Sequence, residues 1–211
     1  MNLCEASVRD QLEAFEQIIC CNPVVVAILE RMAVLDLPDR WLAAGGLVQT
    51  VWNVLSDRDP AAGILDYDVN YYDASDLSWE AEEKAIAGAA AVFDGVEGRV
   101  EVRNEARVHL WYVAKFGVSC PPYRSTRHAI ASFPNCSSCL GVRPGDGRLE
   151  VFAPFGMTDL FALTARPNPV LAPAAVYVAK TQRWAREWPR LTILPWPDDR
   201  SGSASAPSRL S

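Results

Sequence analysis

Two carboxylates one residue apart and a pair of glycines are the residues of this sequence best suited to chemistry. Asp66 and Asp68 lie in segment 65–69, which is expected to be a strand. Side chains alternate along a strand, so both carboxylates are expected on one face, where they repel unless solvent or a cation compensates them. Gly45 and Gly46 precede an expected helix, whose first backbone N–H groups are free to meet an anion such as phosphate. Together these residues predict a site for a metal-bound polyphosphate.

Glu101 adds a third acid to this group. It lies in segment 98–104, which alternates charged and apolar residues and is expected to be a strand beside the one that carries Asp66 and Asp68. Three carboxylates suit Mg²⁺, which prefers oxygen ligands and completes its shell with water and substrate phosphates. Two such ions about 3.5–4 Å apart hold the attacking and leaving oxygens of a phosphoryl displacement. Glu105 is the alternative third ligand, and a merely solvent-facing strand surface is the alternative without chemistry.

The pattern of hydrophobic residues predicts the elements that would position these side chains. Strand, helix, strand, helix and strand are expected in turn at 40–44, 47–55, 64–72, 79–92 and 98–104. Two helices are expected before them, the first capped by Ser7 and the second by Asn22 with Pro23 in its first turn. Further helices and one hairpin are expected at 105–116, 125–133, 173–188 and around 144–147.

These elements predict a division of the chain into four parts. They are N-terminal helices at 1–38, a catalytic core at 39–104, a C-terminal part at 105–197 that completes the fold and cleft, and a disordered tail at 198–211.

Longer motifs give the sequence a specific resemblance. The glycine pair, the Asp-x-Asp strand and the later acid resemble the nucleotidyltransferase superfamily. Five segments resemble, more closely, a poorly characterised bacterial family of nucleotidyltransferase-like proteins, with Asp-x-Asp and Asn-Glu/Gln-Ala-Arg-x-His motifs; they are 65–73, 100–111, 153–161, 166–169 and 188–191. The resemblance implies an α/β (α+β) fold, a small mixed sheet flanked by helices with a helical and hairpin C-terminal part.

The resemblance also implies roles for individual residues. Gly45 and Gly46 would cradle a nucleoside triphosphate, and Asp66 and Asp68 would bind two Mg²⁺ ions. Glu101 would be the third metal ligand and a candidate base for the acceptor hydroxyl. The implied reaction transfers a nucleoside monophosphate from the triphosphate to that hydroxyl and releases pyrophosphate. The alternative is a non-catalytic relative that binds nucleotide or metal as a regulatory module.

Arg107 and His109 follow the third expected strand, and each has more than one candidate role. Arg107 is expected to bind a nucleotide phosphate, with an ion pair to an acid as the alternative. His109 is expected to be a buried histidine satisfied by a carboxylate or a backbone carbonyl. The tryptophans Trp41, Trp52, Trp111, Trp184 and Trp188 are expected to anchor the core or interfaces.

Composition limits the partners and the compartment. The 211 residues carry a net charge of −6, which disfavours broad binding to nucleic acid or to an anionic membrane. The expected acceptor is therefore a small molecule or a protein, with nucleic acid unlikely. No apolar run approaches the roughly 20 residues that span a bilayer, and the N-terminus lacks the pattern of a signal peptide. A cytoplasmic location is expected.

The six cysteines favour a reducing compartment over a metal site. Cys136 and Cys139 form a single C-x-x-C motif, whereas structural zinc needs four ligands, and His109 and His128 are too far apart in sequence to complete the set. The cysteines are therefore expected to be small buried hydrophobic residues, with a zinc site as the weaker alternative.

Overall fold

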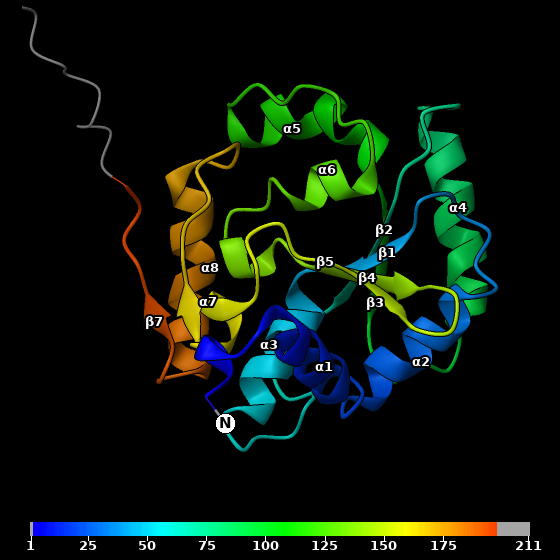
Figure 1. The fold of residues 1–211 in the computed structure, drawn as a ribbon. Coiled ribbons are helices and arrows are strands. Elements are labelled where there is room, and N and C mark those ends of the chain that lie inside the picture. Colours follow the sequence, from blue (N-terminus) through cyan, green and yellow to red (C-terminus); the bar gives the residue numbers. More distant parts are fainter. Residues whose placement is uncertain (1, 198–211) are drawn as a thin grey trace, which may run out of the picture.

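A five-stranded mixed sheet organises the computed structural model, which describes residues 2–197 (Figure 1). The strand order is β3-β2-β1-β4-β5, with β2 and β3 parallel and the other neighbours antiparallel. The strands are β1 (Trp41–Ala43), β2 (Tyr67–Tyr71), β3 (Val100–Asn104), β4 (Gly141–Pro144) and β5 (Leu149–Phe152). A short parallel pair is formed by β6 (Thr164–Ala165) and β7 (Thr192–Ile193). The mixed α+β fold predicted from the sequence is confirmed.

Helices cover both faces of this sheet (Figure 1). They are α1 (Val8–Ile19), α2 (Pro23–Met32), α3 (Gly45–Val54), α4 (Trp79–Val92), α5 (Val108–Phe116), α6 (Thr126–Ile130), α7 (Thr158–Phe161) and α8 (Ala174–Glu187). Short 3₁₀ turns are η1 (Leu3–Glu5), η2 (Glu105–Arg107) and η3 (Cys136–Ser138). The main core packs α1, α2 and α3 against one sheet face, while α5 and α6 lie on the other side.

Alternation along β2 separates the core face from the polar face. Tyr67, Val69 and Tyr71 are buried in the main core. Asp68 and Asn70 therefore project from the opposite face, which is the side covered by α5 and α6. The burial of Tyr67, Val69 and Tyr71 thus determines which face of the sheet carries Asp68, the acid of the candidate site.

The capping residues begin the helices where the sequence predicts. The Ser7 hydroxyl accepts a hydrogen bond from the Asp10 backbone N–H, and the Asn22 side chain accepts from the first turn of α2, with Pro23 at its start. Each side chain satisfies N–H groups that lack a helical partner. The expected helix at 105–116 instead begins as η2, because the Asn104 side chain accepts from the Ala106 N–H and tightens the first turn.

Burial confirms most expectations about large and sulfur-containing side chains. Trp41, Trp52, Trp184 and Trp188 are buried, whereas Trp111 is 40% exposed. The expectation that the cysteines are buried holds for Cys120, Cys136 and Cys139 and is wrong for Cys20 and Cys21, which lie exposed at the end of α1. The predicted tail at 198–211 lies outside the described residues.

In the described part of the chain, no single helix has the length and apolar composition to cross a membrane. The pair α1 and α2 meets that test only together, and the chain bends by 100° between them.

Candidate active site

The register of the sheet brings Asp68 and Glu101 side by side. Asp68 of β2 is the register partner of Glu101 on the parallel strand β3, and of Ala43 on the antiparallel strand β1. Register partners project from the same face of a sheet, so both carboxylates share the polar face. Asp66 lies two residues before Asp68, in the segment that leads into β2. The three acids of the sequence prediction are therefore neighbours in the fold, and their metal-binding roles stay a prediction.

The charge around Asp68 is poorly compensated. Burial, together with the charges of Asp66 and Glu101, raises the pKa of its carboxyl to about 6, and Lys180 and Arg103 act in the opposite direction. Within residues 2–197, neither Asp66 nor Asp68 forms a side-chain hydrogen bond or an ion pair. A carboxylate that is withdrawn from water beside other acids gains most from a bound cation. Asp66 and Asp68 thus fit the oxygen ligands that Mg²⁺ prefers.

Glu101 is held differently. Its Oε1 lies 2.5 Å from Arg99 Nη2, and its Oε2 lies 2.9 Å from Arg103 Nη2. Both carboxylate oxygens are therefore engaged by guanidinium groups. Across residues 2–197, no group of three or more His, Cys, Asp or Glu side chains is close enough together to hold a metal ion. In this arrangement Glu101 becomes a third ligand only when it exchanges an arginine for the metal.

Glu105 is an acid whose burial the sequence does not predict. It lies in η2 and is only 6% exposed, although it forms no side-chain hydrogen bond or ion pair within the described residues. Burial raises the pKa of its carboxyl to about 8; the charge of Asp68 raises it and that of Arg103 lowers it. The alternative third ligand therefore faces the same site, in its neutral form at pH 7.

The glycine pair forms the first turn of α3 directly beyond β1. Ala44 precedes it with φ of +53°, and no side chain caps the helix start. The first N–H groups of α3 therefore have no side-chain acceptor, which is the arrangement that favours an anion. Gly46 has a second, structural reason to be glycine, because a Cβ there would lie 2.5 Å from the Tyr67 ring. Gly45 meets only the flexible end of Gln49.

Arg107 is engaged in a structural ion pair. Its guanidinium pairs with Glu82 of α4, its Nε donates to the Leu77 carbonyl oxygen at 3.0 Å, and it lies 5.3 Å from the centroid of the Trp79 ring. These contacts tie η2 to the start of α4, as the alternative interpretation of Arg107 predicts. Its binding to phosphate stays a prediction, and would have to compete with Glu82.

His109 lacks the partner expected from the sequence. Its Nδ1 is buried with no hydrogen-bond partner among the described residues, so neither Glu105 nor a backbone carbonyl satisfies it.

The C-x-x-C cysteines have no metal-ligating partner among the described residues: Cys139 contacts the Asn168 amide at 3.4 Å, and Cys136 contacts the Pro167 carbonyl at 3.5 Å. Burial raises the pKa of both thiols, which suits the structural role.

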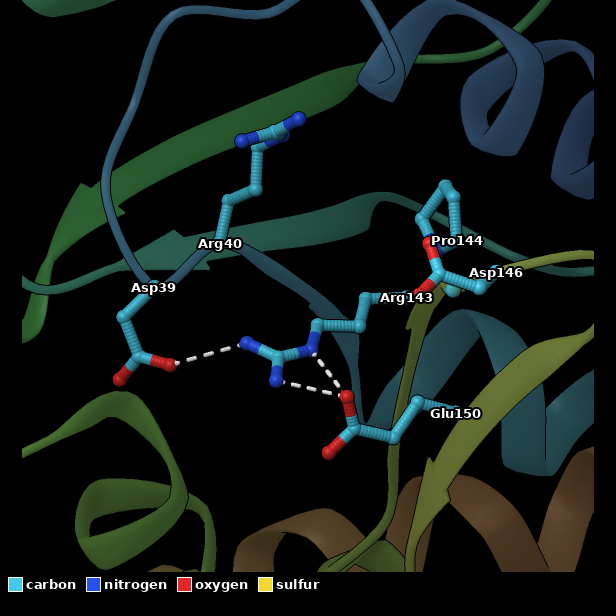
Figure 2. Close-up of a pocket in the computed structure, with 7 residues that line it drawn as sticks. Asp39, Arg40, Arg143, Pro144, Asp146 and Glu150 are labelled. Atoms are coloured by element: carbon cyan, nitrogen blue, oxygen red, sulfur yellow. Dashed lines mark hydrogen bonds and ion pairs between the residues drawn. The ribbon is translucent and has the colours of Figure 1, made fainter.

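A separate hollow of about 350 Å³ lies at the other end of β1 (Figure 2). Arg143 crosses it, with its guanidinium 3.3 Å from Asp39 and 2.6 Å from Glu150. Asp39 also accepts from the Trp41 indole and the Thr126 N–H. Because the guanidinium that crosses this hollow is paired with two carboxylates, the hollow is a poorer nucleotide site than the polar face around Asp68.

Comparison with known proteins identifies the family of the chain and a shared fold. The sequence profile of a family described as nucleotidyltransferase matches residues 30–193, and the chain belongs to that family. A solved structure reported as "The NMR structure of the protein reveals a CCA-adding enzyme head domain" superposes with a TM-score of 0.71 and 24% identity, covering 87% of this chain and 96% of the other. This likeness shows a shared fold. A search of curated proteins found no match.

Two basic residues near this site were not predicted from the sequence. Lys180 and Arg183 of α8 approach Asp68 and the start of α3, respectively. Their helix follows the Asp-x-Asp strand by more than a hundred residues, and its pattern indicates only an amphipathic helix. The local sequence around such a residue does not predict which strand or helix it will contact.

Proposed function

We propose that this protein transfers a nucleoside monophosphate from a nucleoside triphosphate to an acceptor hydroxyl, with Mg²⁺ as cofactor. One observation carries the proposal. In a chain of the nucleotidyltransferase family, the uncompensated carboxylate of Asp68 lies beside Asp66 and Glu101, and its register partner Ala43 lies two residues before the uncapped start of α3.

Each part of the site has a defined task in this reaction. The first N–H groups of α3 bind phosphate oxygens, and Asp66 and Asp68 hold the cofactor. Bound Mg²⁺ supplies charge neutralisation for the phosphates and the attacking oxygen. Glu101 would complete the ligand set by exchanging Arg99 or Arg103 for the metal. A bond forms between the acceptor oxygen and the α-phosphorus, the bond from the α-phosphorus to the β-phosphate bridging oxygen breaks, and the acceptor proton passes to a base or to water.

The neutral state of Glu105 supports this division of tasks. With its pKa raised to about 8, this carboxyl keeps its proton at pH 7 and adds no further negative charge beside Asp68. Asp68, with a pKa of about 6, is charged at that pH. The site therefore presents one strongly desolvated carboxylate rather than two, which limits the repulsion that it must overcome before a cation binds.

A second candidate function is a non-catalytic module that binds nucleotide. The observation that favours it is the engagement of both Glu101 oxygens by Arg99 and Arg103. If that pairing persists when nucleotide binds, the third ligand is missing. The protein would then bind a nucleotide through α3 and the two aspartates without transferring it.

Nucleotide binding tests the site that both candidates share. Isothermal titration with Mg²⁺ and each of ATP, CTP, GTP and UTP is expected to show binding by the wild type, and loss of at least ten-fold in affinity in Asp66→Asn/Asp68→Asn. The matched control is Asp57→Asn/Asp59→Asn, a second Asp-x-Asp pair that is exposed in the loop after α3. Equal binding by wild type and the site variant contradicts the proposed metal ligands.

Transfer separates the two candidates. The same triphosphates, labelled at the α-phosphate, are incubated with small-molecule, protein and RNA acceptors. If an acceptor becomes labelled, and the labelling is lost when Asp66 and Asp68 are replaced, the result supports the enzymatic function. If the protein binds the triphosphates but labels none of the acceptor classes, the result supports the non-catalytic binding module. RNA belongs in the panel because the matched solved structure is named a CCA-adding enzyme head domain, even though the net charge of −6 disfavours nucleic acid.

A further inference from the structure

Arg183 of α8 is linked by hydrogen bonds to the first turn of α3. Its Nη2 donates to Gln49 Oε1 at 3.3 Å, and Gln49 Nε2 donates to the Gly45 carbonyl oxygen at 3.0 Å. The guanidinium therefore lies one side chain away from the backbone that is to bind phosphate. Lys180, three residues earlier, lies on the same side of α8, because residues three apart are neighbours on a helix.

Packing between tryptophans fixes α8 in this position. Trp184 of α8 meets Trp52 of α3 edge to face, with ring centroids 5.3 Å apart and planes at 80°. Trp188 packs on the same Trp52 ring at 5.5 Å and donates from its indole to Asn53 at 3.0 Å. All three indole side chains are buried. The basic residues of α8 are thus held beside α3 by a rigid contact rather than by a mobile loop.

Neither cation is neutralised by the described part of the protein. Within residues 2–197, Lys180 and Arg183 form no ion pair, whereas seven other arginines do. Lys180 is exposed on α8 one helical turn before Arg183, so its ammonium group lies on the side of the helix that Arg183 presents to the start of α3. Two positive groups therefore border a site that already has acids and free helix N–H groups.

We propose that Lys180 and Arg183 bind the β- and γ-phosphates of the nucleoside triphosphate and stabilise the pyrophosphate that leaves. This inference rests on the proposed function of the same site. The N–H groups of α3 would contact the polyphosphate from one side and the two cations from the other. When the bond from the α-phosphorus to the bridging oxygen breaks, the negative charge that develops on the pyrophosphate lies next to both positive side chains, which lowers the barrier to its departure.

Inorganic pyrophosphate is the probe that isolates this contact from the base and the sugar. Titration of Mg²⁺-pyrophosphate, and separately of Mg²⁺-ATP, into full-length wild type, Lys180→Met and Arg183→Met is expected to show about ten-fold weaker binding for each variant. Methionine keeps much of the apolar stem and removes the charge. Arg186→Met is the matched control, because Arg186 is an exposed arginine on α8 with no ion pair in the described residues.

A conservative variant separates charge from structure. Arg183→Lys keeps the positive charge but breaks the geometry of the Gln49 contact, and it is expected to recover most of the pyrophosphate affinity that Arg183→Met loses. A melting temperature measured without ligand shows whether α8 stays packed. If Lys180→Met and Arg183→Met bind pyrophosphate as tightly as wild type and Arg186→Met, the inference is overturned while the proposed function stands. If wild type binds neither pyrophosphate nor any triphosphate, both are overturned.

Discussion

Replacement of Glu105 by glutamine is predicted to stabilise the free protein, by an amount that grows with pH. Glu105 is 6% exposed and its pKa is raised from the ordinary 4.5 to about 8, so the folded protein holds a proton that the unfolded chain releases. The stability contributed by this proton is complete below pH about 4.5 and is lost as the pH rises toward 8. Each pH unit in that window costs about 1.4 kcal/mol.

At pH 7 the ionisation of this one group in the unfolded chain has lowered the free energy of unfolding of the wild type by about 3 kcal/mol. This is a large part of the stability of an ordinary domain. Glu105→Gln resembles the protonated carboxyl in shape and cannot ionise, so the variant is expected to match wild type near pH 5 and to exceed it by about 3 kcal/mol at pH 7. Urea unfolding at pH 5, 6, 7 and 8, in EDTA, measures the difference. Glu83→Gln, on the exposed face of α4, is the control and is expected to show a small difference that does not change with pH.

The reasoning is refuted if the difference between Glu105→Gln and wild type is the same at all four pH values. It is refuted equally if the variant is the less stable protein at pH 8, since that result requires a stabilising charged carboxylate at this position.

Three further substitutions test the packing and the electrostatics of the site. Gly46→Ala is expected to lower the free energy of unfolding by about 1–3 kcal/mol in urea titrations, because its Cβ would overlap the Tyr67 ring; an unchanged midpoint would contradict the close approach. Asp68→Asn is expected to raise it by about 3 kcal/mol above pH 6 without metal, because it removes a desolvated charge, and a loss of stability would show an unrecognised partner. Glu82→Gln is expected to cost about 3 kcal/mol by leaving buried Arg107 without its partner, and a neutral effect in thermal unfolding would show that the pair is dispensable.

The sequence predicts that Asp68 and Glu101 share one face of the sheet, because these positions depend on local rules. Alternation along β2 fixes which side of the sheet Asp68 faces once Tyr67 and Val69 are buried. The crossover through α4 makes β2 and β3 parallel neighbours, as such connections usually do, and this places Glu101 opposite Asp68.

The remaining features depend on contacts between distant segments. Strand β4 pairs with β1, which lies about a hundred residues earlier in the chain, and this pairing puts β1 in the middle of the sheet. The residues of β1 alone do not predict that β4 is its neighbour. The burial of Glu105 follows from how η2 packs, since its place after a strand predicts only a strand end. Arg183 reaches the site because Trp184 packs on Trp52, a contact that the pattern of α8 alone does not specify.

The most direct test of the central claim is a crystal structure of the protein with Mg²⁺ and a non-hydrolysable nucleoside triphosphate analogue. We expect at least one Mg²⁺ ion about 2.1 Å from carboxylate oxygens of Asp66 and Asp68, with phosphate oxygens on the first N–H groups of α3. A nucleotide bound elsewhere, such as in the hollow that Arg143 crosses, or an ion that neither aspartate contacts, would contradict the account.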